Sequence, residues 1–195
     1  MLTFVTKVNH CFLIHTTLQT GRIEIIYGCM FSGKTKELIR RLKSAKDKHQ
    51  KTLIVKPQID DRYDINRIVS HDRHSLGCLP IESSQEIINY SKGVSIVGID
   101  ETQFFDDNIT AVCQELVSNG IRVIAAGLDM DYKRKPFGAM PQLLSIADQV
   151  TKLSANCHSC GQPANYTYRL ADGDQQIMLG EKKEYEARCK NCYEK

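Results

Sequence analysis

Short hydrophobic runs recur along the middle of the chain and are separated by polar segments. β-Branched and aliphatic residues dominate the segments 22–27, 52–55, 94–99, 122–126 and 150–153. Continuous apolar runs of this length, bounded by turn residues, are typical of strands that are buried on both faces of a sheet. We therefore expect five strands here.

Hydrophobic residues between two of these runs follow the helical period instead. In the segment from 36 to about 48, Leu38, Ile39 and Leu42 share one face, and Lys and Arg residues occupy the other. This spacing predicts an amphipathic helix. The sequence Ser83-Ser84-Gln85-Glu86 is a capping box and predicts the start of a further short helix.

A third helix is expected over 109–117, with Asn119-Gly120 as its end. The polar segments 57–66 and 127–140 are expected to be loops. Strands that alternate with helices predict an α/β fold with a mostly parallel sheet and helices on both faces. This domain should cover residues 22–153.

The two ends of the chain differ from this middle part. After Ser154 the aliphatic runs give way to Cys, Tyr and Gly, which indicates a second, smaller domain over 154–195. Residues 1–21 match no element and are expected to be a poorly ordered extension, or the product of an upstream start codon. The apolar stretch Leu2–Leu18 is interrupted by polar residues, lacks Arg and has no A-x-A-like site, which disfavours a targeting signal.

Composition and charge exclude several classes of protein. The 195 residues are 42% hydrophobic and 25% charged, as expected of a globular protein. The net charge of +3 is too small, and the basic residues too scattered, to predict a nucleic-acid partner. No apolar run approaches the roughly 20 residues that span a bilayer. We expect a cytoplasmic protein without a membrane or nucleic-acid partner.

A phosphate-binding loop follows the first expected strand. The sequence Gly28-Cys29-Met30-Phe31-Ser32-Gly33-Lys34-Thr35 matches G-x-x-x-x-G-K-[ST] between a strand and a helix. Backbone N–H groups of such a loop bind phosphate oxygens, Lys34 should reach the β- and γ-phosphates, and the Thr35 hydroxyl should bind Mg²⁺. The motif alone predicts binding of a nucleoside triphosphate.

Two acids follow the apolar run 94–99. Asp100 and Glu101 would lie at the carboxyl end of a parallel strand, where α/β sheets bind ligands. Asp100 is the expected Mg²⁺ partner, and Glu101 is the expected base that takes the acceptor's proton. Two alternatives remain: both acids only end a strand at the surface, or Glu101 activates water as in an ATPase.

Four of the eight cysteines form two C-x-x-C pairs. Cys157 with Cys160 and Cys189 with Cys192 are separated by residues 161–188, a longer interval than in a zinc ribbon. Four thiolates predict a structural Zn²⁺ site with no open coordination position. Disulfides or free thiols are the alternatives, and isolated thiols elsewhere in the chain favour a reducing compartment.

The motifs together resemble those of the type II thymidine kinases. They are Met30-Phe-Ser-Gly-Lys, Ile99-Asp-Glu-x-Gln-Phe-Phe105, Arg134-Lys-Pro-Phe-Gly138 and the cysteine pairs, in this order over residues 22–193. The resemblance implies a P-loop (RecA-like) ATP-binding domain and a small zinc-binding domain with a lasso loop that closes over thymidine. It implies transfer of the γ-phosphate of ATP to the 5′-hydroxyl of thymidine, with Mg²⁺.

The resemblance also assigns residues to each part of the site. Asp61-Arg62-Tyr63 resembles the family's D-x-R-Y segment, and Arg62 would neutralise charge on the transferred phosphate. The ATP site would comprise Gly28 to Thr35 together with Asp100, Glu101, Thr102 and Gln103. Thymidine would be bound by Met30, Phe104, Leu128, Tyr132, Phe137, Thr167, Gln176, Met178 and Tyr185, and the segment 128–137 would be a mobile lid.

The family further implies a homotetramer that thymidine triphosphate inhibits. Two other classes share some of these motifs: a RecA-like ATPase with a zinc ribbon that acts on nucleic acid, and a non-catalytic nucleotide sensor. The first should carry a basic, aromatic surface and a higher charge, and the second has no need of Glu101. Both are therefore less favoured than a kinase.

Overall fold

The computed structural model describes residues 21–60, 66–70, 72, 74–171, 175–176 and 183–195. Residues 1–20 of the expected extension, together with Arg62 and Met178, lie outside these ranges. No helix in the described ranges has the length and hydrophobicity that crossing a membrane requires.

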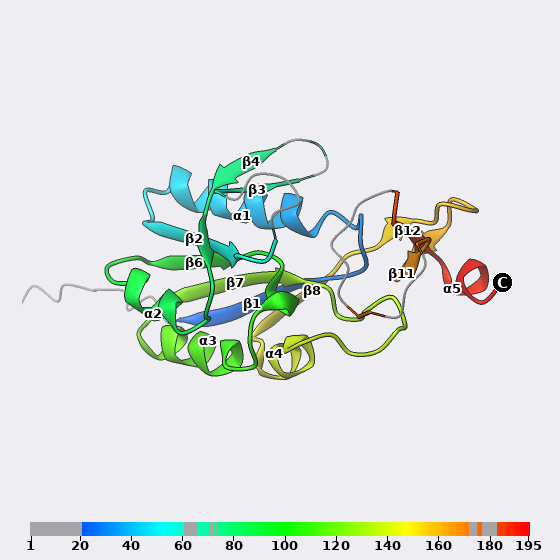
Figure 1. The fold of residues 1–195 in the computed structure, drawn as a ribbon. Helices are drawn as coiled ribbons and strands as arrows, with labels where there is room; N and C mark the ends of the chain where they lie inside the picture. The colour runs from blue at the N-terminus through cyan, green and yellow to red at the C-terminus, as the bar shows by residue number, and fades with distance from the viewer. Residues whose placement is uncertain (1–20, 61–65, 71, 73, 172–174, 177–182) are drawn as a thin grey trace, which may run out of the picture.

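A six-stranded sheet forms the centre of the molecule (Figure 1). Its order is β5-β2-β6-β7-β1-β8, and every neighbouring pair is parallel. The strands are β1 (Arg22–Tyr27), β2 (Thr52–Pro57), β5 (Leu79–Ile81), β6 (Ile96–Ile99), β7 (Arg122–Gly127) and β8 (Gln149–Lys152). The predicted parallel α/β sheet is confirmed, and β5 is a strand that the sequence pattern did not indicate.

Helices cover both faces of the sheet, as predicted (Figure 1). One face carries α1 (Lys34–Asp47), and the other carries α2 (Glu86–Tyr90), α3 (Ile109–Ser118) and α4 (Met140–Ile146). Neighbouring residues of β1 enter different cores: Ile25 packs with the α3 side and Ile26 with the α1 side, because strand side chains alternate. Burial of each such Ile or Leu side chain contributes about 1.5–3 kcal/mol to the stability of the fold.

Several short elements were not predicted from the sequence. They are α4, the hairpin of β3 (Arg67–Val69) and β4 (Ser75–Gly77), and the 3₁₀ turn η1 (Thr102–Phe104). Three-residue elements are too short to show a hydrophobic period. The capping box is formed on one side only, where Ser83 N–H donates to Glu86 Oε1 at 3.0 Å.

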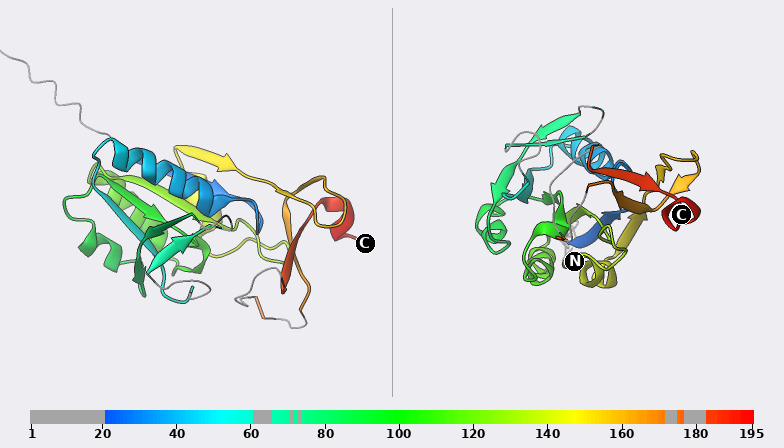
Figure 2. Two further views of the ribbon diagram at one scale, coloured as in Figure 1. Left: turned by 90° about the horizontal axis from the view of Figure 1, so that it is seen from above. Right: turned by 45° about the vertical axis from the view of Figure 1, so that its right-hand side comes forward.

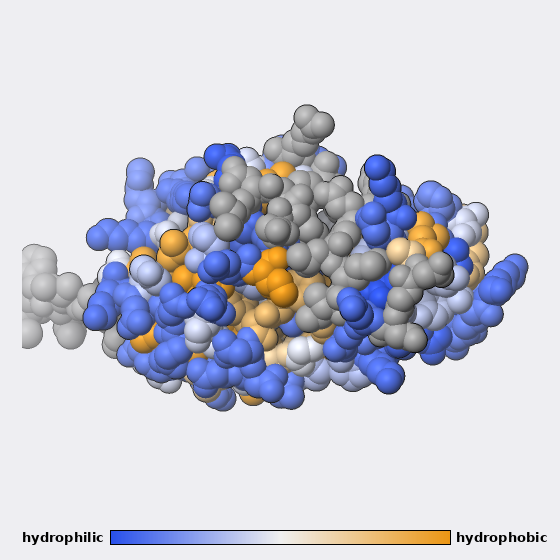
Figure 3. Space-filling view, viewed as in Figure 1, coloured by the Kyte–Doolittle hydropathy of each residue, from blue (hydrophilic) through white to orange (hydrophobic). Residues whose placement is uncertain are grey.

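The C-terminal part of the chain lies beyond the carboxyl ends of the strands (Figure 2). Its described residues form two antiparallel ribbons and one helical turn: β9 (Ala155–Asn156) with β10 (Pro163–Ala164), β11 (Tyr166–Arg169) with β12 (Tyr185–Arg188), and α5 (Lys190–Tyr193). In the view of Figure 3 the surface is mostly hydrophilic, and hydrophobic residues gather near its centre.

Candidate active site

The phosphate-loop sequence forms a tight turn between β1 and α1. Phe31 and Gly33 have φ of 65° and 86°, in the left-handed region that glycine adopts most readily. A Cβ atom on Gly28 would lie 2.2 Å from the Leu153 carbonyl oxygen, so only glycine fits there. The loop therefore depends on the glycines that identified it in the sequence.

Lys34 is held across this loop. Its Nζ donates to the Cys29 carbonyl oxygen at 2.9 Å, and the residue is buried. As the first residue of α1, Lys34 also lies where the helix N-terminus adds partial positive charge. The loop thus places a cation and backbone N–H groups at one point, as anion binding requires.

A cavity of about 330 Å³ opens beside the loop. Nine of the residues predicted from the sequence line it: Met30, Phe31, Ser32, Gly33, Lys34, Thr35, Asp100, Glu101 and Leu128. Gly28, Cys29, Thr102 and Gln103 lie behind this wall and are buried. Thr102 donates its hydroxyl to the Ala126 carbonyl at 2.9 Å and so fixes η1 against β7.

Asp100 reaches the phosphate loop although the two strands are not neighbours. It follows β6, and β7 lies between β6 and β1. The Thr35 hydroxyl donates to Asp100 Oδ1 at 3.3 Å. Burial, followed by the charges of Glu101 and Asp60, raises the pKa of Asp100 to about 7. Carboxylate and hydroxyl oxygens are ligands that suit Mg²⁺, so this donor set fits the cation.

Glu101 has an unusual backbone conformation, with φ 48° and ψ 41°. Residues other than glycine occupy this region at a cost of about 1–3 kcal/mol, and such strain is concentrated at functional sites. Its carboxylate accepts a 2.6 Å hydrogen bond from Gln103 Nε2. Gln103 Oε1 in turn accepts from the Leu128 backbone N–H at 2.9 Å. Gln103 thus fixes the orientation of the Glu101 side chain.

Apolar and aromatic residues predicted to bind thymidine follow the carboxyl ends of neighbouring strands, with Met30 after β1, Phe104 after β6 and Leu128 after β7. The rings of Phe104 and Phe137 pack edge to face with centroids 5.6 Å apart. Phe137 and Leu128 are buried. The Met30 backbone N–H donates to Thr167 Oγ1 at 3.0 Å, which ties the phosphate loop to β11. Chain segments far apart in the sequence are thereby brought together.

Three further predicted pocket residues are described, Tyr132, Gln176 and Tyr185, and they converge on an arginine that the sequence did not single out. Buried Arg169 stacks over the Tyr132 ring at 3.7 Å and donates to Tyr185 Oη from Nη2 at 2.7 Å. It also donates to the carbonyls of Gln175 and Gln176, at 2.6 and 3.4 Å. Arg169 therefore joins the 128–137 segment, β12 and the residues Gln175 and Gln176.

Asp131 supports the same junction from the other side. Its Oδ2 accepts from Gln176 Nε2 at 2.9 Å, and its Oδ1 accepts from the backbone N–H groups of Lys133 and Lys135. The sequence held no signal for Arg169 or Asp131, because each acts through residues distant along the chain.

Two further cavity residues were missed for different reasons. Asp60 is buried, lines the cavity and contributes to the raised pKa of Asp100. The four-residue pattern D-x-R-Y starts at Asp60 rather than at Asp61. Correct alignment of this pattern would have identified Asp60 from the sequence. Buried Lys56 lies at the end of β2 and donates to the Arg67 carbonyl at 3.3 Å, and no sequence motif marked it.

The four paired cysteines form one cluster. Their sulfur atoms all lie within 4.8 Å of one another, and Cys160 Sγ and Cys189 Sγ are 3.6 Å apart. Tetrahedral Zn–S bonds of about 2.3 Å place sulfurs about 3.8 Å apart, so the cluster fits zinc. Backbone N–H groups, that of Cys189 first, lower the pKa of Cys157 to about 6, which favours a metal-binding thiolate. All four are free thiols.

This cluster packs against the phosphate loop. Cys29 of the loop is buried with Ala155, Ala164 and Ala187, and Phe31 borders the same small core. The Cys29 thiol donates to the Ala164 carbonyl, with 3.3 Å between Sγ and the oxygen. The C-terminal ribbons therefore contact the phosphate loop directly.

Comparisons with known proteins match nearly the whole chain. The family model described as thymidine kinase matches residues 21–193. A thymidine kinase of Bacteroides thetaiotaomicron is 53% identical over 180 residues, 92% of this chain and 90% of that protein. One of Porphyromonas gingivalis is 51% identical over 179 residues, 92% of this chain and 88% of that protein. One of a Rhodothermus species is 46% identical over 174 residues, 89% of this chain and 82% of that protein.

Proposed function

This chain belongs to the thymidine kinase family, and we propose on that premise that it transfers the γ-phosphate of ATP to the 5′-hydroxyl of thymidine. The products are thymidine monophosphate and ADP. One observation carries the proposal: a family match over residues 21–193 coincides with a cavity lined by both the phosphate loop and Glu101. Phosphoryl transfer needs little more than positioning, charge neutralisation and a base.

The phosphate loop binds the triphosphate of ATP. Loop N–H groups and the α1 N-terminus hold the phosphates, and the Lys34 ammonium neutralises the β- and γ-phosphate oxygens. Thr35 and Asp100 would hold Mg²⁺, which supplies further charge neutralisation when bound. Arg62 would serve the transferred phosphate, and it lies outside the described residues.

Glu101 takes the proton from the thymidine 5′-hydroxyl. The Gln103 amide that bonds its carboxylate fixes the rotamer, and the Leu128 N–H fixes Gln103 in turn. A base must be held within hydrogen-bond reach of the proton that it removes. The left-handed backbone at Glu101 turns the side chain into the cavity that the phosphate loop also lines.

The thymidine pocket consists of Met30, Phe104, Leu128, Tyr132, Phe137, Thr167, Gln176 and Tyr185, with Met178 outside the described residues. Flat aromatic rings and aliphatic side chains suit a thymine ring with its 5-methyl group. Support comes from the contacts that bring these residues together through Arg169 and Thr167. The lasso would close over the base and contact its edge mainly with backbone groups.

The four clustered cysteines bind a structural Zn²⁺. Their mutual sulfur distances and the absence of disulfides among the described cysteines support this proposal. We further propose that residues 22–153 form the ATP-binding domain and residues 154–195 the zinc-binding domain. The metal would then hold both ends of the β10–β12 segment beside the phosphate loop.

Membership of the family suggests the remaining properties. The enzyme would act in the cytoplasm as a homotetramer, without nucleic acid, in the salvage of deoxynucleosides for DNA synthesis. Thymidine triphosphate would inhibit it, because the end product offers both the base and the phosphates that the site recognises.

A coupled assay tests the reaction. Purified protein with Mg-ATP and thymidine should form thymidine monophosphate and ADP without added DNA, and should hydrolyse little ATP without nucleoside. Lys34→Ala should abolish transfer, because the loop loses the cation that neutralises the phosphates. The circular dichroism spectrum should stay unchanged. ATP hydrolysis stimulated by DNA, with no thymidine monophosphate, would identify the nucleic-acid ATPase instead.

A further inference from the structure

A second cleft lies at the opposite end of the sheet from the phosphate loop. Its volume is about 350 Å³, and it is lined by Arg22, Glu24, Arg40, Arg41, Ser44, Ala45, Lys48, Gln50, Arg122 and Gln149. Arg22 and Arg122 begin the adjacent strands β1 and β7 and are paired in register. The six residues of β1 span about 20 Å, so this cleft is separate from the ATP site.

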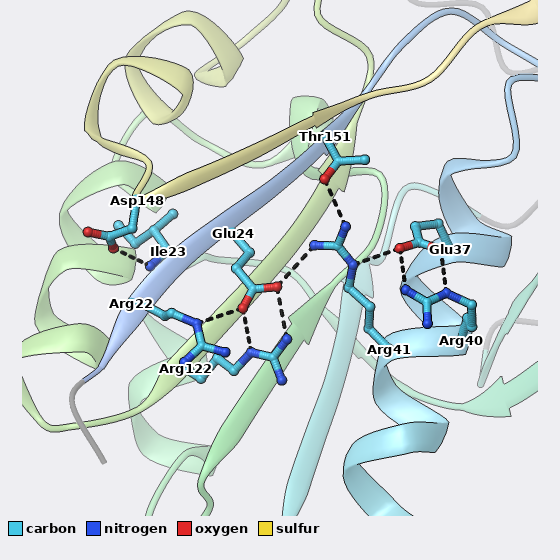
Figure 4. A network of polar contacts seen from close by, with 9 residues as sticks. All are labelled: Arg22, Ile23, Glu24, Glu37, Arg40, Arg41, Arg122, Asp148 and Thr151. Atoms are coloured by element: carbon cyan, nitrogen blue, oxygen red, sulfur yellow. Dashed lines mark hydrogen bonds and ion pairs between the residues drawn. The ribbon is translucent and has the colours of Figure 1, made fainter. Parts of the chain in front are cut away.

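Glu24 organises the cationic side chains of this cleft (Figure 4). Its side chain is 2% exposed and accepts from Arg22 Nε at 2.7 Å and from Arg41 at 3.0 Å. Arg122 donates to both of its oxygens, at 2.6 and 2.9 Å. Both oxygens of one carboxylate are thus occupied by three guanidinium groups.

The cleft carries more positive charge than its acids compensate. Five cations line it, and Glu24 and Glu37 are the acids that the described contacts pair with them, which leaves a surplus of 5 − 2 = 3. Figure 4 shows terminal nitrogens of Arg22 and Arg122 without a contact to the residues drawn. Several cations gathered around one buried carboxylate give the cleft a positive potential, which suits an anionic ligand.

Two occupants from this protein fit the surplus poorly. The segment 1–20 precedes Arg22 and contains no Asp or Glu, so it brings no carboxylate to the cleft. A second copy that docks this same face would bring another surplus of positive charge, which disfavours a symmetric contact.

We propose that this cleft binds the phosphate groups of a small polyanion, either an inorganic polyphosphate or the triphosphate of a nucleotide. Guanidinium groups match phosphate oxygens with paired N–H donors. Arg41 is fixed by Glu24, Glu37 and Thr151 and forms a rigid part of the wall beside Arg22 and Arg122. Ser44, Gln50 and Gln149 add neutral polar groups. Ala45 is the only apolar residue among the described residues that line the cleft, so a base would meet no aromatic side chain there.

Pyrophosphate binding tests the proposal separately from the kinase activity. Calorimetry on Lys34→Ala, in which the phosphate loop is disabled, should still detect one pyrophosphate site per chain. Adding Arg40→Gln and Lys48→Gln should weaken that site about tenfold or more. ATP and inorganic triphosphate should bind the Lys34→Ala protein within about threefold of each other, because the described lining offers the base no aromatic or large apolar side chain.

Lys43→Gln with Lys46→Gln is the matched control. Both lysines are exposed on α1 outside the lining of the cleft, and the pair removes the same amount of charge as Arg40 in α1 and Lys48 at its C-cap. This control should bind pyrophosphate as Lys34→Ala alone does. The proposal is wrong if Lys34→Ala binds no pyrophosphate, or if both double substitutions weaken it equally. With Lys34 intact, Arg40→Gln/Lys48→Gln should keep thymidine kinase activity.

Discussion

The backbone of Glu101 is the most informative feature at the scale of single residues. A non-glycine residue in the left-handed region is maintained only where surrounding contacts enforce it, and here Gln103 and Thr102 do so. The strain is therefore built into the turn that presents the carboxylate. This feature suits a group whose position matters more than its contribution to stability.

Replacement of Glu101 by Gln should lower kcat by about 10²–10⁴-fold, the usual contribution of a general base. Glutamine keeps the size and can still accept the Gln103 hydrogen bond, but it cannot take a proton. Thymidine affinity should change little. Steady-state kinetics with calorimetric thymidine binding measures both quantities.

Asp107→Asn is the control for that substitution, because Asp107 is an exposed acid shortly after η1. It should leave kcat unchanged. A Glu101→Gln enzyme that retains more than about a tenth of wild-type kcat, a smaller loss than a base contributes, would exclude Glu101 as the base. Asp60, which lines the same cavity, would then be the next candidate.

At the scale of elements, Arg169 connects three segments that lie far apart along the chain. Arg169 is the last residue of β11, and its side chain stacks on Tyr132 of the 128–137 segment. It also donates hydrogen bonds to Tyr185 of β12 and to the carbonyls of Gln175 and Gln176. The proposed thymidine pocket would therefore depend on a side chain that need not touch thymidine.

Arg169→Met should raise the thymidine KM about tenfold or more, since hydrogen bonds to charged groups contribute about 1.5–3 kcal/mol. The ATP KM should stay close to wild type, because the phosphate loop is formed by other contacts. Arg169→Lys should not restore binding, as an ammonium lacks the planar fork. Initial-rate kinetics against each substrate gives this division.

Arg134→Met is the matched control for Arg169. Arg134 stacks on Tyr166 and Tyr193 and pairs with Glu194, and none of these three is a proposed thymidine residue. Its loss should leave the thymidine KM within about threefold of wild type, as expected for a partly exposed cation–π pair. Equal effects of the two substitutions would contradict a specific role for Arg169.

The cysteine cluster connects the ends of the C-terminal ribbons. Wild-type protein should contain about one zinc per chain by elemental analysis, since four thiolates complete one tetrahedral site. Cys189→Ser should lose the zinc. It should raise the thymidine KM more than it weakens ATP binding, because β11 and β12 carry Thr167, Arg169 and Tyr185.

Cys78→Ser, outside the cluster, should retain the metal. Protein purified without chelators that contains no zinc, or disulfides at the four cysteines, would disprove the zinc site.

At the scale of the whole molecule, the Glu24 network should make stability depend on pH. Burial opposes ionisation of Glu24, but hydrogen bonds from Arg122 and Arg22 outweigh it and lower the pKa from 4.5 to about 2. A folded-state pKa below the unfolded value means that the stabilisation is present above about pH 4.5. It is lost as the pH falls toward 2.

The difference in unfolding free energy between wild type and Glu24→Gln should therefore shrink by up to about 3 kcal/mol between pH 6 and pH 2. Denaturant titrations over this range measure the difference. Glu37, whose pKa is also lowered, is present in both proteins, so the subtraction removes its effect. A difference that is constant with pH would show that Glu24 gains nothing from its arginines.

The sequence by itself determined the features that depend on neighbouring residues. The phosphate loop, the main strands with α1 and α3, and the cysteine pairs each rest on short-range spacing. Backbone geometry, hydrophobic period and thiolate chemistry act over a few residues, so these features can be recognised without a partner segment. The family and its reaction followed from the order of these motifs.

Only the tertiary structure decided which distant side chains meet. Glu24 bonds Arg122 across 98 positions, and Arg169 stacks on Tyr132 of another segment. A parallel sheet needs long connections between neighbouring strands, so its ends collect residues that are remote along the chain. For this physical reason the Gln103–Leu128 contact, the Arg169 junction and the cationic cleft at the start of β1 and β7 became visible only in the folded molecule.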